Sequence, residues 1–193
     1  VYFGGGVVLG NASEEMTKFV RMIGAPCTGT LMGLGAYPSS DRQFLGMLGM
    51  HGTYEANLAM QNADVVLAIG ARFDDRVISV PSKFFEKAKK IIHIDVDPSS
   101  IAKRVKVDIP IVGDVKNVLS EMIQLWGKQE SAPAVDSLDK WWKSIEEWRS
   151  RNCLWFDNES EIIKPQYVIQ KLAEITNNSA IITSDVGQHQ MFT

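Results

Sequence analysis

Charged residues gather directly after one short apolar run, and they are the first candidates for chemistry in this sequence. Residues 65 to 69, Val-Val-Leu-Ala-Ile, form a continuous apolar run with β-branched side chains, which predicts a strand buried on both faces. Gly70 ends the run, and Ala-Arg-Phe-Asp-Asp-Arg follows at residues 71 to 76. In open α/β sheets, ligands bind beyond the carboxyl ends of the strands. Two cations and two carboxylates at this position therefore predict a binding loop. The alternative is an ordinary surface loop with ion pairs among the four side chains.

Two glycine-rich stretches could let the backbone approach a large ligand. Gly4, Gly5 and Gly6 follow an apolar start and precede a helical pattern, which is the strand, turn and helix order of phosphate-binding sites. Residues 24 to 52 hold seven of the fifteen glycines, and a core strand would not tolerate so many because each costs about 0.5 to 1 kcal/mol. We expect this second stretch to lie flat against a planar ligand. The alternatives are a tight turn in the first stretch and a self-packed loop in the second.

An acidic strand end adds a further candidate group. Residues 91 to 98 predict a buried strand that ends in acidic residues. An acidic side chain about 20 residues beyond the glycine turn of a strand-helix-strand unit commonly accepts ribose hydroxyls, and Asp95 occupies such a position after Gly70. Its alternative role is to cap a helix after Pro98. His93, in the middle of the strand, is expected to be a core or rim residue rather than a catalyst.

Alternating strand and helix patterns predict the fold class. From residue 1 to 126 they indicate an α/β fold with a doubly wound parallel sheet and helices on both faces, as in Rossmann-like nucleotide-binding domains. One of these helices is expected at residues 81 to 90. Residues 127 to 137 form a polar linker. Residues 138 to 193 begin with a tryptophan-rich helix that must dock on something and include an expected strand at 180 to 185. We expect them to be the truncated start of a second α/β domain, in a fragment of a longer polypeptide.

Composition argues against several classes of protein. The chain of 193 residues has a net charge of −3 and no cluster of lysines and arginines on an expected helix face, so no nucleic-acid partner is expected. No apolar run is long enough to cross a bilayer, and no membrane partner is expected. The three histidines lack metal-ligand spacing, so no metal site is expected in this chain. Two cysteines far apart predict no disulfide framework and a reducing, cytoplasmic setting.

Seven short motifs occur in a fixed order along the chain. They are Gly-Gly-Gly at 4 to 6, Thr-Leu-Met-Gly-Leu-Gly at 30 to 35, Leu-Gly-Met-His-Gly at 48 to 52, Gly-Ala-Arg-Phe-Asp-Asp-Arg at 70 to 76, Ile-Asp-Val-Asp at 94 to 97, Gly-Asp-Val at 113 to 115 and Gly-Gln-His-Gln-Met at 187 to 191. Each motif alone is weak, but the full set is specific. With it, nearly the whole chain resembles the catalytic large subunit of acetolactate synthase, also called acetohydroxyacid synthase, a thiamine-diphosphate enzyme.

The resemblance implies two domains and their cofactors. Residues 1 to 126 would be the FAD-binding middle domain, and residues 138 to 193 would be the N-terminal part of the thiamine-diphosphate (pyrophosphate-binding) domain. FAD, in a structural rather than a redox role, would lie against Gly5, Thr30, Leu31, Leu48, Gly49, Met50, His51, Gly70, Ala71, Arg72, Phe73, Asp74, Asp95, Val96, Asp114 and Val115. Gln188 and His189 match the family positions beside thiamine diphosphate.

The resemblance also implies a reaction on 2-ketoacids. The family decarboxylates pyruvate on thiamine diphosphate, with Mg²⁺, and condenses the hydroxyethyl unit with a second pyruvate or with 2-ketobutyrate in branched-chain amino-acid biosynthesis. No catalytic residue is assigned in this chain, because the glutamate that activates thiamine belongs to the family's first domain and the magnesium motif would follow Thr193. We expect the chain alone to be inactive. The full subunit would form a cytoplasmic homodimer or homotetramer with a small regulatory subunit.

Two other functions stay open at this point. One is the same domain from another thiamine-dependent carboligase, such as glyoxylate carboligase, in which FAD is also structural. Met50-His51 and Asp-Asp-Arg at 74 to 76 favour acetolactate synthase over this enzyme. The other is a non-catalytic nucleotide-binding module that senses ADP or NAD. Ligand preference separates it, because a flavin ring needs the platform of glycine, Leu and Met at residues 30 to 51 and ADP does not.

Overall fold

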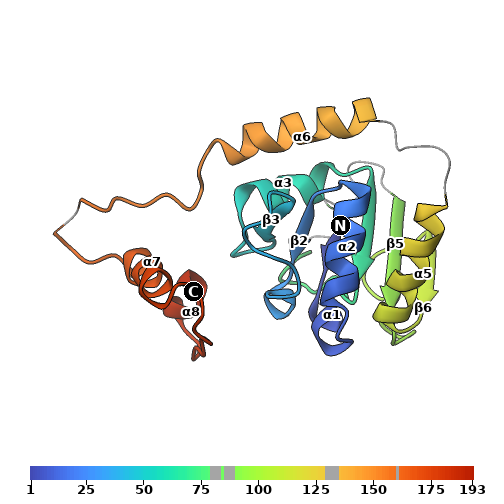
Figure 1. The fold of residues 1–193 in the computed structure, drawn as a ribbon, viewed down its shortest axis with the longest axis horizontal. Helices are drawn as coiled ribbons and strands as arrows, with labels where there is room; N and C mark the ends of the chain where they lie inside the picture. Colours follow the sequence, from blue (N-terminus) through green and yellow to red (C-terminus); the bar gives the residue numbers. More distant parts are fainter. Residues whose placement is uncertain (79–83, 85–89, 129–134, 160) are drawn as a thin grey trace. The chain divides into compact units, whose positions relative to one another are not determined.

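Six parallel strands form the centre of the computed structural model (Figure 1). They are β1 (Tyr2–Phe3), β2 (Cys27–Gly29), β3 (Phe44–Met47), β4 (Val65–Ile69), β5 (Lys90–Asp95) and β6 (Ile109–Val112). Their order across the sheet is β3-β2-β1-β4-β5-β6, and every neighbouring pair is parallel. The strand order therefore reverses between β1 and β4, which makes a topological switch point. The expected α/β class with a parallel sheet is confirmed.

The structure describes residues 1–78, 84, 90–128, 135–159 and 161–193. They form two compact units, Val1–Arg151 and Asn152–Thr193, and each unit is described by itself. Most of the helix expected at residues 81 to 90 and most of the linker expected at residues 127 to 137 lie outside the described residues. Within the described ranges, no helix has both the length and the apolar character needed to cross a membrane.

Three helices cover one face of the sheet, namely α1 (Gly5–Leu9), α2 (Ser13–Ile23) and α5 (Val115–Gly127). Helix α2 buries Met16, Phe19 and Val20, whose spacing of three and four residues places them on one side of the helix. These side chains pack in one cluster with Phe3 of β1 and Leu119 of α5. The helical pattern that follows the glycine triplet in the sequence is therefore a core face.

The opposite face of the sheet is covered by α3 (Tyr54–Asn62) and α6 (Val135–Arg149). Thr53 caps α3, because its Oγ1 accepts a hydrogen bond from the N–H of Ala56 at 3.2 Å. The same hydroxyl donates to the carbonyl of Leu45 at 2.6 Å, which ties the start of α3 to β3. One buried threonine thus fixes the connection from the edge strand to the helix.

Helix α6 packs on the first unit and explains the tryptophan-rich pattern. Ile145 is fully buried in the cluster on the α3 face of the sheet. Trp142 donates its indole N–H to the carbonyl of Gly24 at 3.0 Å, and Arg149 donates through Nη2 to the carbonyl of Arg42 at 2.9 Å. The compact unit therefore extends to Arg151, further than the domain of residues 1 to 126 expected from the sequence.

Strand β3 lies in the glycine-rich stretch of residues 24 to 52, where the sequence analysis argued against a core strand. β3 is a short edge strand, so the argument from core strands does not apply to it. Gly46 within it has φ 90°, and a Cβ there would lie 2.7 Å from Cγ2 of Thr53. The glycine therefore makes room for the threonine that caps α3.

The second unit contains α7 (Pro165–Thr176) and α8 (Gln188–Phe192). The strand expected at residues 180 to 185 is not formed. Its apolar side chains face solvent, and Ile181 is 95% exposed. A strand requires neighbours that bond its N–H and C=O groups, and the described part of this unit supplies no strand beside it. An apolar pattern alone was therefore not sufficient for this prediction.

Replacement of Ile145 by alanine tests whether α6 is part of the first unit. Because Ile145 is fully buried, we expect Ile145→Ala to lower the free energy of unfolding by about 2 to 5 kcal/mol. Ile175→Ala is the matched control, since Ile175 is 82% exposed, and it should change the free energy by less than about 0.5 kcal/mol. Urea unfolding followed by tryptophan fluorescence measures both. An Ile145 variant as stable as the wild type would show that α6 does not pack as described.

Candidate functional site

A cavity of about 570 Å³ lies at the carboxyl ends of the strands, over the switch point between β1 and β4. Its wall is built from the segments that follow β1, β2, β3, β4 and β5. Most residues that the sequence analysis assigned to FAD line this one cavity: Gly5, Thr30, Leu31, Leu48, Met50, His51, Gly70, Ala71, Arg72, Asp74, Asp95 and Val96. The fold thus brings together residues that are far apart in the sequence.

The remaining residues assigned to FAD lie away from the wall of this cavity. Gly49 exchanges two hydrogen bonds, of 2.8 and 3.0 Å, with the side-chain amide of Asn57. Phe73 is buried in the core on the α3 face. Asp114 caps α5 by accepting a hydrogen bond from the N–H of Asn117 at 3.1 Å, and the neighbouring Val115 is buried. These four residues make structural contacts and do not form the cavity surface.

Gln188 and His189, expected beside thiamine diphosphate, lie in the second unit. They are the first two residues of α8, and both side chains are exposed. The backbone N–H of Gln190 donates to the carbonyl of Gly187, which closes the first turn of this short helix. Their role toward thiamine diphosphate stays a prediction.

Two backbone segments meet below the cavity at a distance that only glycine permits. The N–H of Gly6 donates to the carbonyl of Gly70 at 3.0 Å. A Cβ on Gly6 would lie 2.7 Å from Cα of Gly70, and a Cβ on Gly4 would lie 2.5 Å from the carbonyl oxygen of Gly70. Gly70 also has φ 56°, a left-handed backbone conformation that residues with a side chain rarely adopt. The glycine triplet thus makes a close backbone contact between the ends of β1 and β4. The chain then continues from the triplet into the short helix α1.

The charged loop after β4 keeps one guanidinium largely open to solvent. The Arg72 side chain is 72% exposed, and its Nη2 lies 3.7 Å from Oδ2 of Asp74, an ion pair of low strength at this exposure. The N–H of Arg76 donates to Oδ1 of Asp74 at 3.0 Å, and this bond is the main cause that lowers the pKa of the Asp74 carboxyl. An exposed guanidinium beside an ionised carboxylate remains free to bind phosphate.

Asp95 lines the cavity at the end of β5, and it does not cap a helix. Its Oδ1 accepts a hydrogen bond from the N–H of Asp97 at 2.9 Å. The turn after Pro98 is instead held by Asp97, which accepts bonds from the N–H and the hydroxyl of Ser99 at 2.9 and 2.8 Å. The alternative role of Asp95 is therefore wrong. A carboxylate offers about four acceptor positions, so Asp95 can also accept hydrogen bonds from a ligand.

Apolar side chains surround the mouth of the cavity. Met32 and Met50 are 75% and 70% exposed, and Leu9, Leu31 and Val96 are also exposed. Exposed apolar groups next to a few polar ones are typical of a small-molecule site. The cavity therefore combines an apolar surface with the ionic groups of Arg72, Asp74 and Asp95. Such a surface fits a ligand that joins a flat ring to a charged group.

Several wall residues were not singled out as contacts by sequence reasoning. Gly4, Gly6, Met32 and Arg76 belong to motifs that it had recognised, and Met47 lies in the expected platform of residues 30 to 51, so the sequence carried a signal for these five residues. The other four are placed only by the way the strands and loops converge, and the sequence carries no local signal for them. The wall residues missed are Tyr2, Gly4, Gly6, Leu9, Met32, Met47, Arg76, Val77 and Ser100.

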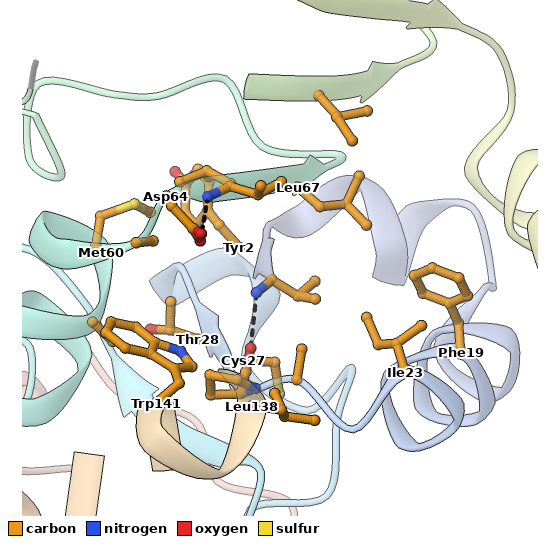
Figure 2. A pocket seen from close by; sticks show the side chains of 18 of the residues that line it. Tyr2, Phe19, Ile23, Cys27, Thr28, Met60, Asp64, Leu67, Leu138 and Trp141 are labelled. Atoms are coloured by element: carbon orange, nitrogen blue, oxygen red, sulfur yellow. Dashed lines mark hydrogen bonds between the residues drawn. The ribbon is translucent and has the colours of Figure 1, made fainter. Parts of the chain in front are cut away.

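A second cavity, of about 470 Å³, lies at the amino ends of the strands (Figure 2). Figure 2 shows Leu138 and Trp141 of α6 on one side of it and Phe19 and Ile23 of α2 on another. Cys27 of β2 also lines it, and burial raises the pKa of this thiol to about 12. The wall is mainly apolar, and none of the residues assigned to a cofactor line it.

Thiol labelling tests the burial of Cys27. Because the thiolate is the reactive form, a buried thiol with a pKa of about 12 should not react at pH 8 in the native chain, whereas Cys153 is exposed. We expect Ellman's reagent to titrate one thiol in the native chain and two after denaturation in guanidinium chloride. A Cys153→Ser chain should be unreactive until it unfolds. Rapid labelling of that native variant would contradict the packing of β2.

Substitution of Gly6 tests the contact between the two strand ends. A methyl group on Gly6 would collide with backbone atoms of Gly70, so we expect Gly6→Ala to lower the free energy of unfolding by about 1 to 3 kcal/mol. Gly127→Ala is the control, because a Cβ at Gly127 meets no atom within 4 Å and the residue lies at the end of α5. That variant should be unchanged or slightly more stable. Thermal and urea unfolding of both chains give the comparison, and equal effects would refute the close contact.

Comparison with known proteins agrees with this arrangement. Residues 1–122 match the model of the family described as thiamine pyrophosphate enzyme, central domain. The chain is 50% identical over 192 residues to acetolactate synthase isozyme 3 large subunit of Escherichia coli (strain K12) and to acetolactate synthase large subunit of Haemophilus influenzae, with 100% of this chain and 33% of each relative covered. It is 42% identical over 193 residues to acetolactate synthase of Mycobacterium bovis, with 100% of this chain and 31% of the relative covered. The chain thus spans about a third of the length of the curated relatives it matches. It belongs to the family of thiamine pyrophosphate enzymes and carries their central domain.

Proposed function

We propose that this chain is the FAD-binding middle part of an acetolactate synthase large subunit, and that the residues after Arg151 begin its pyrophosphate-binding domain. Similarity to acetolactate synthase large subunits extends over the whole chain at 50% identity. The observation that carries the proposal is the cavity at the switch point. It joins an exposed apolar surface to separate ionic groups, and most of the residues assigned to FAD converge on it.

The groups around the cavity fit FAD. Arg72 would bind a phosphate through its exposed guanidinium. Asp95 would accept hydrogen bonds from ribose hydroxyls, as acidic residues at strand ends do in nucleotide-binding folds. Met32 and Met50 would contact the apolar ring system, and the glycine contact between β1 and β4 leaves space for the ligand to approach the backbone. FAD is proposed as a structural component, since the reaction itself needs no redox step.

The reaction of the whole protein is proposed from the relatives. Thiamine diphosphate with Mg²⁺ would supply the chemistry that decarboxylates pyruvate and joins the two-carbon unit to a second pyruvate or 2-ketobutyrate in branched-chain amino-acid biosynthesis. Gln188 and His189 are the residues of this chain proposed to contact thiamine diphosphate, and none is proposed as the general acid or base.

The assembly and location follow from the same proposal. The relatives in Escherichia coli and Haemophilus influenzae are described as large subunits. This supports a homodimer or homotetramer of the full subunit, with a small regulatory subunit beside it. Cys27 and Cys153 form no disulfide in the part of the chain that the structure describes, which is typical of a reducing compartment and supports a cytoplasmic location.

Ligand preference tests the proposal against its alternatives. The 193-residue chain should bind FAD at least tenfold more tightly than ADP or NAD in parallel calorimetric titrations, because only FAD carries the flavin ring. Met32→Ala should weaken FAD binding and leave ADP binding unchanged, since this exposed side chain belongs to the apolar surface. Equal affinities for all three nucleotides would favour a nucleotide-sensing module. No binding of FAD would reject the proposed site.

The phosphate contact has its own test. Arg72→Gln removes the guanidinium and should raise the Kd of both FAD and ADP by about three- to tenfold at low salt, with a smaller change at high salt. Arg151→Gln is the control, because Arg151 lies over the ring of Tyr54 and does not line the cavity. A loss of FAD affinity in the control equal to that in Arg72→Gln would argue that net charge alone is responsible.

A further inference from the structure

His93 is the most completely buried polar side chain beside the cavity. It is 0% exposed, and neither of its ring nitrogens has a hydrogen-bond partner among the described residues. An imidazole without partners in a core is costly, because each buried polar atom loses its bonds to water. A residue chosen only to fill this space would be apolar. The presence of a polar ring at this position therefore indicates a role that depends on the groups around it.

One ring nitrogen of His93 faces the carboxylate of Asp95. The two residues are two positions apart on β5, so both side chains lie on the same face of the strand. Nε2 of His93 lies 3.9 Å from Oδ2 of Asp95. The other oxygen of that carboxylate, Oδ1, is held by the N–H of Asp97 at 2.9 Å. The Asp95 side chain is thus fixed on one side by a backbone bond and approached on the other by the imidazole.

The remaining neighbours of His93 hold the ring in place. Phe73 packs edge to face against it, with ring centroids 5.3 Å apart and an interplanar angle of 89°. The residues opposite His93 in the sheet are Ala68 on β4 and Pro110 on β6, and neither has a polar side chain. Burial is the main cause that lowers the pKa of His93, against the opposite effects of Asp95 and the backbone of Ala71, and it favours the neutral form of the ring.

We propose that His93 is a positioning residue for the ligand of the cavity. In its neutral form, with the proton on Nε2, it faces Oδ2 of Asp95 and holds the carboxylate in the orientation that accepts hydrogen bonds from the ribose of a dinucleotide. This inference rests on the proposed FAD site, because Asp95 lines that cavity and His93 does not. His93 would not touch the ligand, and it would act entirely through Asp95.

Ligand binding by three variants tests this role. His93→Leu replaces the ring by an apolar group of similar size and should raise the Kd of FAD by about tenfold without lowering the melting temperature. His93→Gln, whose amide N–H can reach the position of Nε2, should recover much of the affinity. In an Asp95→Asn background, His93→Leu should have no further effect, because the group it acts through is gone. A packing role would instead give additive losses and no recovery by glutamine.

The protonation state of His93 gives a second test that needs no ligand. Nitrogen-15 NMR of the histidine-labelled chain at pH 7 should show a neutral imidazole with the proton on Nε2, and His93→Leu identifies the signal. A proton on Nδ1 would overturn the inference, and this measurement decides the matter if the leucine variant does not fold. Normal FAD affinity in a folded His93→Leu chain would also overturn it. Failure of the wild-type chain to bind FAD would instead reject the proposed function itself.

Discussion

The structure depends on one close contact, between the backbones that leave β1 and β4. These strands are neighbours in the sheet, and the segments after them turn away from each other at the switch point. Gly6 and Gly70 meet there through a backbone hydrogen bond of 3.0 Å, with no room for a side chain on either residue. Because this contact is made by the main chain alone, the space above it stays open. The segments after β2, β3 and β5 then close around that space to form the cavity.

The same sheet must be covered on both faces, and this requirement determines how far the first unit extends. Successive residues of β1 and β4 point to opposite faces, as Tyr2 and Phe3 do, and both faces are apolar. Helices α1, α2 and α5 cover one face. Helix α3 covers part of the other face, and α6 supplies Ile145 to the core there. The helix after the expected linker therefore belongs to the compact unit that carries the cavity.

Sequence reasoning succeeded where a residue type carries its own signal and failed where a contact depends on distant partners. Strand β4 is a continuous apolar run, β5 is rich in isoleucine, and the charged loop after β4 is visible in composition, so all three were predicted. The edge strand β3 was missed because it is short and contains Gly46. Residues 180 to 185 have an apolar pattern but no strand beside them in the described unit. Tyr2 reaches the cavity only through the packing of the finished sheet, and no local pattern indicates it.

The cavity at the carboxyl ends of the strands has charged groups in its wall, whereas the cavity at the amino ends is mainly apolar. The direction of the strands explains this difference. Parallel strands place all of their carboxyl ends at one edge, so the polar segments that follow them collect there and bring Arg72, Asp74 and Asp95 to one cavity. At the amino ends of β1 and β2, Leu138 and Trp141 of α6 close a mainly apolar cavity. Charged groups at the carboxyl ends stay hydrated until a ligand replaces the water. Substitutions that alter ligand contacts at one edge can therefore occur without disturbing the apolar contacts that stabilise the other.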